Sequence, residues 1–151
     1  MHCPKCNAKD TRVIDSRLSK NGHAIRRRRE CQQCGARFST IEETLREGLI
    51  VRKRDGRSEP FDRTKIQSGL NRACEKRPID IEQIDMLVSD VIVELEAEHE
   101  TEIPSEAIGN KIMQHLKNVD KIAYVRFASV YKDFRDIEEL EQAISVLKND
   151  D

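Results

Sequence analysis

Four cysteines in two closely spaced pairs are the residues of this 151-residue chain best suited to chemistry. Cys3 and Cys6 form one C-x-x-C pair, Cys31 and Cys34 form the other, and 24 residues separate the pairs. Two-residue spacing lets a tight turn direct both thiolates to one point, so two such turns complete a tetrahedral zinc site. The usual spacer is about 15–20 residues, and a longer hairpin would accommodate the extra length. The pattern predicts one structural zinc ion per chain, because four thiolates leave no coordination position open for a substrate.

Disulfides and a redox pair are the alternative uses of such cysteines. Met1-His2-Cys3-Pro4 lacks the apolar stretch of a signal peptide, which disfavours a secreted, disulfide-linked domain. The fifth cysteine, Cys74, would be left over from two disulfides, and no βαβ pattern supports a thioredoxin-like pair. Cys74 shares a helical stripe with Ile66 and Leu70, so we interpret it as a small buried residue.

A hairpin must bring the two cysteine pairs together. Residues 11–18 and 24–30 read as its two arms, and residues 19–23, which include Asn21-Gly22, read as the connection. Too few apolar residues lie here to bury a core, so the metal must supply most of the folding energy. The sequence therefore predicts a β-rich zinc ribbon over residues 1–48.

The predicted ribbon is strongly basic although the whole chain carries a net charge of −1. Residues 1–48 hold 11 Lys/Arg and 6 Asp/Glu (+5), whereas residues 49–151 hold 16 and 22 (−6). An isolated charge run is commonly a solvated surface, but residues 26–29 are four arginines on a predicted strand, so two would project from each face. Two-stranded ribbons enter the major groove, and arginine binds both phosphates and guanine edges. Phe38 is the one aromatic residue within residues 1–48, so few bases could be stacked and duplex DNA is favoured over single strands. The candidate DNA-binding residues are Arg12, Arg17, Arg26, Arg27, Arg28, Arg29 and Arg37.

The acidic remainder reads as a short hairpin followed by helices. Residues 49–54 predict a strand, Asp55-Gly56 a two-residue turn, and residues 57–61 the returning strand. We expect one helix over 62–76 and a second that begins at Asp80, which forms a capping box with Gln83. The glutamate-rich residues 94–102 should form the frayed end of the second helix and a loop. A third helix should begin at Pro104-Ser105, and one long helix over 121–147 should follow Asp120 as its cap. The predicted fold class is α+β: a small ribbon followed by a mainly α-helical domain with an N-terminal β-hairpin.

Motifs for common enzyme chemistry are missing from the sequence. It contains no Walker A motif, no G-x-G-x-x-G, no H-E-x-x-H and no G-x-S-x-G, and its four histidines are scattered. No run of about 18 apolar residues occurs, so no transmembrane helix is predicted. We therefore expect a cytoplasmic protein that is not an enzyme.

Two segments resemble the ATP-cone, the regulatory nucleotide-binding domain at the N-terminus of many ribonucleotide reductases. Residues 51–66 (VRKRDGRSEPFDRTKI) resemble its opening, and the similarity extends through residues 121–134. A four-cysteine ribbon with IRRRR at 25–29, placed directly before such a cone, resembles the NrdR family of bacterial repressors of ribonucleotide reductase genes. The resemblance implies a DNA-binding domain over 1–48, an ATP-cone over 49–139 and a C-terminal helical extension over 140–151.

The resemblance also implies a mechanism. ATP or dATP bound to the cone would set the state of a homo-oligomer that pairs through its cones. Assembly would then decide whether the ribbons bind paired operator boxes in double-stranded DNA, with dATP favouring repression and the DNA-bound protein lying on the nucleoid. The alternative is a nucleotide-sensing protein–protein interaction module that acts on ribonucleotide reductase or RNA polymerase.

By the same resemblance, lysine and arginine side chains would neutralise phosphates and Glu59 would accept hydrogen bonds from adenine or ribose. Ile66 and Ile108 would flank the base. Reductase cones can carry a histidine where this chain has Gly109, so base packing would change or room would remain for a second nucleotide. Tyr124 and Tyr131 would either join the core or line that room. The implied nucleotide-binding residues are Val51, Lys53, Arg54, Glu59, Lys65, Ile66, Ile108, Tyr124 and Tyr131.

Overall fold

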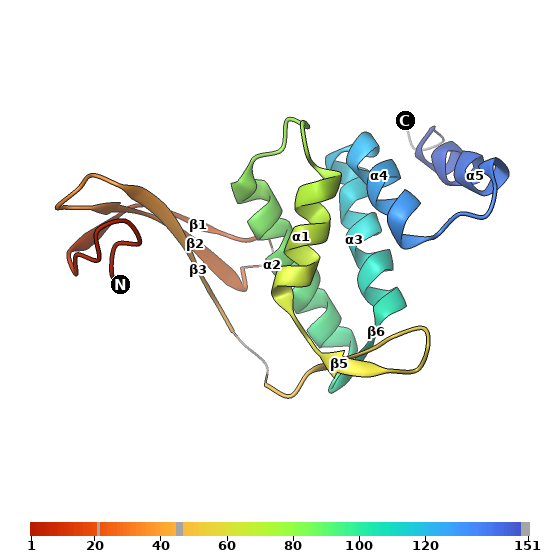
Figure 1. Cartoon of the computed structure of the whole chain (residues 1–151), viewed down its shortest axis with the longest axis horizontal. Helices are drawn as coiled ribbons and strands as arrows, with labels where there is room; N and C mark the ends of the chain where they lie inside the picture. The colour runs from red at the N-terminus through yellow and green to blue at the C-terminus, as the bar shows by residue number, and fades with distance from the viewer. Residues whose placement is uncertain (21, 45–46, 149–151) are drawn as a thin grey trace. The chain divides into compact units, whose positions relative to one another are not determined.

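The computed structural model describes residues 1–20, 22–44 and 47–148 of the chain. The chain separates into two compact units, Met1–Leu45 and Arg46–Asp151 (Figure 1). The described strands of the first unit form one sheet, and every described helix lies in the second unit. The fold is α+β, as the sequence predicted.

The first unit is a three-stranded antiparallel ribbon. Its strands are β1 (Thr11–Leu18), β2 (Ala24–Cys31) and β3 (Arg37–Glu43), in the order β1-β2-β3. A bulge interrupts the pairing of β1 with β2 between Val13 and Asp15. Of the predicted connection, Asn21 lies outside the described residues, while Gly22 has a φ of +77° and donates its N–H to Ser19 O at 3.0 Å.

Strand β3 corrects the expectation of a two-stranded ribbon. It pairs along β2 from Ala24 opposite Glu43 to Glu30 opposite Arg37. Its sequence, RFSTIEE, has few apolar residues to mark it as a strand. Strand β3 forms because its backbone pairs with β2. The arginine-rich strand β2 therefore has an outer strand on each side.

A second small sheet, in the order β5-β4-β6, opens the second unit. Strands β4 (Ile50–Arg52) and β5 (Ser58–Pro60) are antiparallel, and Gly56 takes a φ of +84° in the turn between them. Strand β6 (Glu102–Pro104) pairs parallel to β4. Of the helix end and loop expected over 94–102, helix α2 continues to Glu98 and a loop follows over 99–101, but Glu102 belongs to β6 and corrects the expectation there.

The predicted caps begin three of the helices. Asp62 accepts a hydrogen bond from Thr64 N before α1 (Arg63–Ala73). Asp80 and Gln83 form the capping box of α2 (Ile81–Glu98). Asp120 separates α3 (Ser105–Val119) from α4 (Lys121–Tyr131) and accepts from Ala123 N.

The single long helix expected over 121–147 is two helices. Helix α4 ends at Tyr131, and α5 (Ile137–Lys148) begins after a non-helical segment. Asp133 takes a left-handed φ of 50°, which interrupts the helix although neither glycine nor proline marks the site. Asp136 then restarts it, because its carboxylate accepts a hydrogen bond from Glu139 N at 2.9 Å.

The core of the second unit lies between its helices. Helix α1 packs on α2 and α4, and α3 packs on the same two helices (Figure 1). Cys74 is buried in this core, as predicted. None of the described helices combines the length and the apolar character that crossing a bilayer requires. The largest fully buried core side chains are those of Leu70, Val88, Val91, Leu95, Ile103 and Leu116.

Candidate functional site

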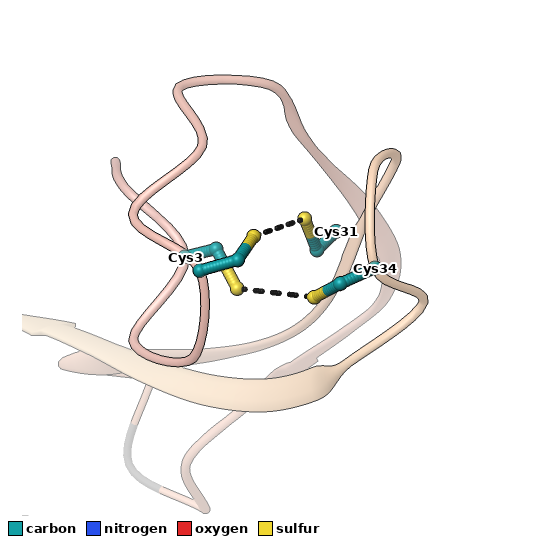
Figure 2. A group of neighbouring side chains, drawn as sticks. Cys3, Cys31 and Cys34 are labelled. Atoms are coloured by element: carbon teal, nitrogen blue, oxygen red, sulfur yellow. Dashed lines mark hydrogen bonds between the residues drawn. The ribbon is translucent and has the colours of Figure 1, made fainter.

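The four predicted metal ligands meet at one point of the ribbon. Their sulfur atoms all lie within 4.8 Å of one another, and Figure 2 shows Cys3, Cys31 and Cys34 directed toward a common centre. The Sγ atoms of Cys3 and Cys34 are 3.7 Å apart, and those of Cys6 and Cys31 are 3.6 Å apart. A tetrahedral zinc ion with Zn–S bonds of about 2.3 Å places its sulfurs about 3.8 Å apart. The cluster therefore fits zinc held by four thiolates.

Both cysteine turns have the same backbone conformation. In the first, Asn7 N donates to Cys3 O at 2.8 Å, and in the second, Gly35 N donates to Cys31 O at 3.0 Å. Asn7 and Gly35 each follow the second cysteine of a pair and take left-handed φ values of 60° and 69°. Glycine and asparagine adopt this conformation at low cost, which explains why these residue types close the turns.

Backbone amides of the turns also point at the sulfurs. Lys5 N lies 3.4 Å from Cys3 Sγ, and Gln33 N lies 3.4 Å from Cys31 Sγ. Hydrogen bonds from the backbone of Cys6 and, less strongly, of Lys5 lower the pKa of the Cys3 thiol to about 6. Donors aimed at sulfur favour the thiolate, the form that binds a metal.

The four consecutive arginines of β2 differ in their partners. Among the described residues, Arg28 has no hydrogen-bond or ion-pair partner, and its side chain is exposed. It is therefore the member of the run whose guanidinium is available for a ligand. The other three bind within the ribbon: Arg26 to Ser39 Oγ at 2.9 Å, Arg29 to Thr11 Oγ1 at 3.3 Å, and Arg27 to the Glu42 carboxylate.

The outer strands contribute the remaining candidate arginines. Arg12 on β1 and Arg37 on β3 both bind the Glu30 carboxylate, at 2.7 and 2.9 Å. The hydrogen bond from Arg12 and, to a smaller extent, that from Arg37 lower the pKa of Glu30. Arg17 pairs with Asp15 on its own strand at 3.0 Å.

A pocket of about 220 Å³ lies in the second unit, between the β4–β5 hairpin and helices α1, α3 and α4. One side is apolar, with Val51, Ile66 and Ile108 among its walls, and such a surface suits a planar base. Seven of the nine residues proposed from the resemblance line it, namely Val51, Lys53, Glu59, Lys65, Ile66, Ile108 and Tyr131.

The lysines of this pocket are joined through a carboxylate. Glu59 Oε1 accepts from Lys53 Nζ at 3.0 Å and from Lys65 Nζ at 2.8 Å. The hydrogen bond from Lys65, followed by that from Lys53, lowers the pKa of Glu59. A phosphate that binds either ammonium group through its remaining donors would therefore lie close to the negative charge of Glu59.

Tyr131 fills the space in front of Gly109. A Cβ atom at Gly109 would lie 2.0 Å from the Tyr131 ring, so the missing histidine side chain leaves no vacant room at that point. The Tyr131 ring stacks on Phe127 with centroids 5.9 Å apart, and its hydroxyl donates to Glu106 O at 2.8 Å. Arg54 also lies over this ring, with its guanidinium carbon 5.2 Å from the ring centroid.

Arg54 and Tyr124, the other two proposed residues, do not line the first pocket. They border a second cavity of about 650 Å³, which Tyr131 also lines. Tyr124 is buried, as a core residue would be, and Tyr131 stands between the two cavities.

Sequence reasoning missed half of the residues that line the first pocket. Gly69 follows Ile66 by three residues on α1, and Ile112 follows Ile108 by four on α3, so helical spacing could have identified both. No local pattern marked the rest, because separate elements bring them together. The lining residues outside the proposed set are Phe61, Asp62, Gly69, Ser105, Gly109, Ile112 and Phe127, of which Gly109 was singled out only for the histidine that it lacks.

Comparison with known proteins assigns both units. Residues 1–42 match the family model described as "Transcriptional repressor NrdR-like, N-terminal domain", and residues 49–137 match the ATP cone domain. A transcriptional repressor NrdR from Opitutus terrae is 58% identical over 147 residues, which cover 97% of each chain. The chain belongs to the NrdR family. Two further NrdR repressors support this assignment. The one from Fervidobacterium nodosum is 50% identical, over 99% of this chain and 98% of the relative. The one from Bifidobacterium animalis subsp. lactis is 48% identical, over 100% of this chain and 74% of the relative.

The NrdR match divides between the two sites described above. The NrdR-like N-terminal model spans all four cysteines and the arginine-rich strand. The ATP-cone model spans the pocket that holds Lys53, Glu59 and Lys65. This NrdR chain thus carries a basic ribbon with a four-cysteine metal site and an ATP-cone with a pocket, in separate units.

Proposed function

We propose that this protein is a zinc- and ATP-binding transcriptional repressor that binds paired operator boxes upstream of ribonucleotide reductase genes. ATP or dATP in the cone controls the homo-oligomer and thereby DNA binding. The observation that carries the proposal is that one chain joins a basic four-cysteine ribbon to an ATP-cone whose pocket contains two lysines. The protein acts as a regulator rather than an enzyme, in the bacterial cytoplasm and on the nucleoid.

The ribbon, within residues 1–48, makes the DNA contact. Arg28 has no partner among the described residues, so it binds DNA without first breaking a protein contact. Arg12 and Arg37 are also exposed and keep spare donors. Zinc holds the cysteine turns and hence the register of the strands, and it supplies no reactive position.

The cone, within residues 49–139, takes the base and the phosphates at different walls of its pocket. Val51, Ile66 and Ile108 contact the base, and Lys53 and Lys65 attract the phosphates. Arg54, Tyr124 and Tyr131 border the neighbouring cavity, so they transmit occupancy toward α5 and the extension over 140–151. Cones of neighbouring chains then pair differently in different nucleotide states.

The test measures DNA affinity and molar mass of the full-length protein in parallel. Fluorescence anisotropy with a duplex from upstream of a reductase gene is recorded with no nucleotide, with ATP and with dATP, and light scattering gives the mass in each state. We expect affinity to differ by about 5- to 150-fold between nucleotide states, which corresponds to ordinary allosteric coupling. Equal affinity and unchanged mass in all three states would overturn the proposed gating.

A pair of matched variants separates the pocket from general charge effects. Lys53→Gln should abolish the nucleotide response while zinc content stays at one ion per chain. Lys76→Gln removes the same charge from an exposed residue between α1 and α2 and should keep the response. If wild-type protein binds nucleotide but has no affinity for duplex DNA at low salt, the protein–protein module is the better description.

A further inference from the structure

Three residues form a row across the ribbon, one on each strand. Glu30 on β2 lies directly opposite Arg12 on β1 and directly opposite Arg37 on β3. Directly opposite residues of antiparallel strands project from the same face of a sheet. The row therefore places a carboxylate between two guanidinium groups on one face.

Glu30 holds both arginines through separate oxygens. Its Oε1 accepts from Arg12 Nη2 at 2.7 Å, and its Oε2 accepts from Arg37 Nε at 2.9 Å. The Glu30 side chain is only 18% exposed, whereas those of Arg12 and Arg37 are 63% and 59% exposed. The carboxylate thus lies beneath two guanidinium groups that remain open to solvent.

Each guanidinium keeps most of its donors. Arginine has five N–H donors in a planar fork, and these two bonds use one donor of Arg12 and one of Arg37. The row retains a net charge of +1. Arg28 lies two residues from Glu30 on β2 and so projects from the same face.

We propose that Glu30 is a positioning residue that presents Arg12 and Arg37 as a paired clamp for the DNA phosphate backbone. The clamp rests on the DNA binding proposed above and assigns part of it to these three residues. A long side chain that is ordered in advance loses less conformational freedom on binding, so the carboxylate raises affinity although its own charge repels phosphate.

If Glu30 positions the two arginines, removing its charge should weaken DNA binding, whereas electrostatics alone predicts stronger binding. Glu30→Gln makes the ribbon more positive, which by charge alone strengthens DNA binding. Glutamine, however, offers one acceptor oxygen, and its NH₂ group cannot accept from the second arginine. We therefore expect the variant to bind DNA about 2- to 12-fold more weakly, because the second arginine must now be ordered on binding.

The ribbon offers a matched control on its other face. Glu42 pairs with Arg27, and Arg27 is three residues from Glu30 on β2, so this pair projects from the opposite face. Glu42→Gln makes the same change of charge in the same sheet without touching the row. It should leave affinity unchanged or raise it.

The experiment uses full-length protein and a fluorescein-labelled duplex of mixed sequence, because phosphate contacts are independent of sequence. Anisotropy titrations over a range of salt, in the nucleotide state that binds DNA best, should give weaker binding for Glu30→Gln. They should also give a salt slope reduced by up to about 0.9, the value for one lost phosphate contact. Zinc content and thermal midpoint check that each ribbon is folded.

A second background separates positioning from a structural defect. In an Arg12→Ala/Arg37→Ala protein, Glu30→Gln should leave affinity unchanged or raise it, because the residues that Glu30 positions are gone and only the change of charge remains. Equal or tighter binding by Glu30→Gln in the wild-type background would overturn the clamp, and so would the same loss in both backgrounds. Absence of binding by the wild-type protein would instead overturn the DNA-binding function itself.

Discussion

Replacing Gly109 with alanine should destabilise the second unit, although a glycine-to-alanine change inside a helix ordinarily stabilises that helix. Gly109 lies inside α3, where alanine is favoured over glycine by about 0.8–1.0 kcal/mol. Here the added Cβ would lie 2.0 Å from the Tyr131 ring, a distance that the ring can relieve only by moving.

Moving Tyr131 disrupts three contacts at once. Its stacking on Phe127 is worth about 0.5–1.5 kcal/mol, its hydrogen bond to Glu106 O about 0.5–1.5 kcal/mol, and the exposed cation–π contact with Arg54 about 0.5–1 kcal/mol. Subtracting the gain in helix propensity leaves a net loss of about 0.5–3 kcal/mol, which agrees with the cost of overpacking a core.

Gly69→Ala is the matched control for this substitution. Gly69 also lies inside a helix and lines the same pocket, but a Cβ there would lie 3.5 Å from Phe127, an ordinary contact. This variant should therefore gain about 0.8–1.0 kcal/mol. Urea unfolding followed by circular dichroism at 222 nm measures both changes, because all the described helices belong to the second unit. If Gly109→Ala is as stabilising as Gly69→Ala, the packing of Tyr131 described above is wrong.

Two further predictions test the ribbon and the helix junction. Cys31→Ser should reduce bound zinc from one ion to none by elemental analysis and unfold the ribbon, because the metal supplies most of its folding energy, while ellipticity at 222 nm changes little; retained zinc would refute the ligand set. Asp120→Asn should lower the thermal midpoint at pH 7, since Arg77 bonds to both Asp120 oxygens at 2.9–3.1 Å. The hydrogen bonds from Arg77 lower the pKa of Asp120 in the folded protein. The ion pair therefore stabilises the fold fully at any pH above about 3.9, the pKa of an aspartate in the unfolded chain, and this stabilisation is lost as the pH falls through the lower pKa of the folded protein. The variant should therefore differ from the wild type at neutral pH and converge with it in acid, and a difference independent of pH would contradict this.

Local signals in the sequence were sufficient wherever a structure depends on neighbouring residues. Asp62, Asp80 with Gln83, and Asp120 cap helices as predicted, because a cap needs only its own first turn. The cysteine spacing likewise predicted a cluster that the structure forms. In both cases residue type and short spacing contain the whole interaction.

The features that sequence reasoning missed depend on distant partners. Strand β6 exists because it pairs with β4, about fifty residues earlier, and three residues are too few to show a period. The break after Tyr131 occurs at Asp133, whose left-handed conformation carries no glycine signal. The space at Gly109 is filled from α4 by Tyr131, one of the two tyrosines considered for it, and nothing near Gly109 in the sequence decides between them.

The two units share one electrostatic motif, a carboxylate between two cations, but different cations give it different consequences. Glu30 holds two arginines, whose remaining donors stay open, so a DNA phosphate binds without displacing it. Glu59 holds two lysines, whose compact ammonium groups bring a bound nucleotide phosphate close to the Glu59 carboxylate, so repulsion between the two anions favours drawing the lysines away from Glu59. On the proposed function, the ribbon is therefore prepared for DNA in every state, whereas the cone rearranges when it binds its ligand. A ligand controls an equilibrium only through a difference between states, which locates the switch in the cone rather than in the ribbon.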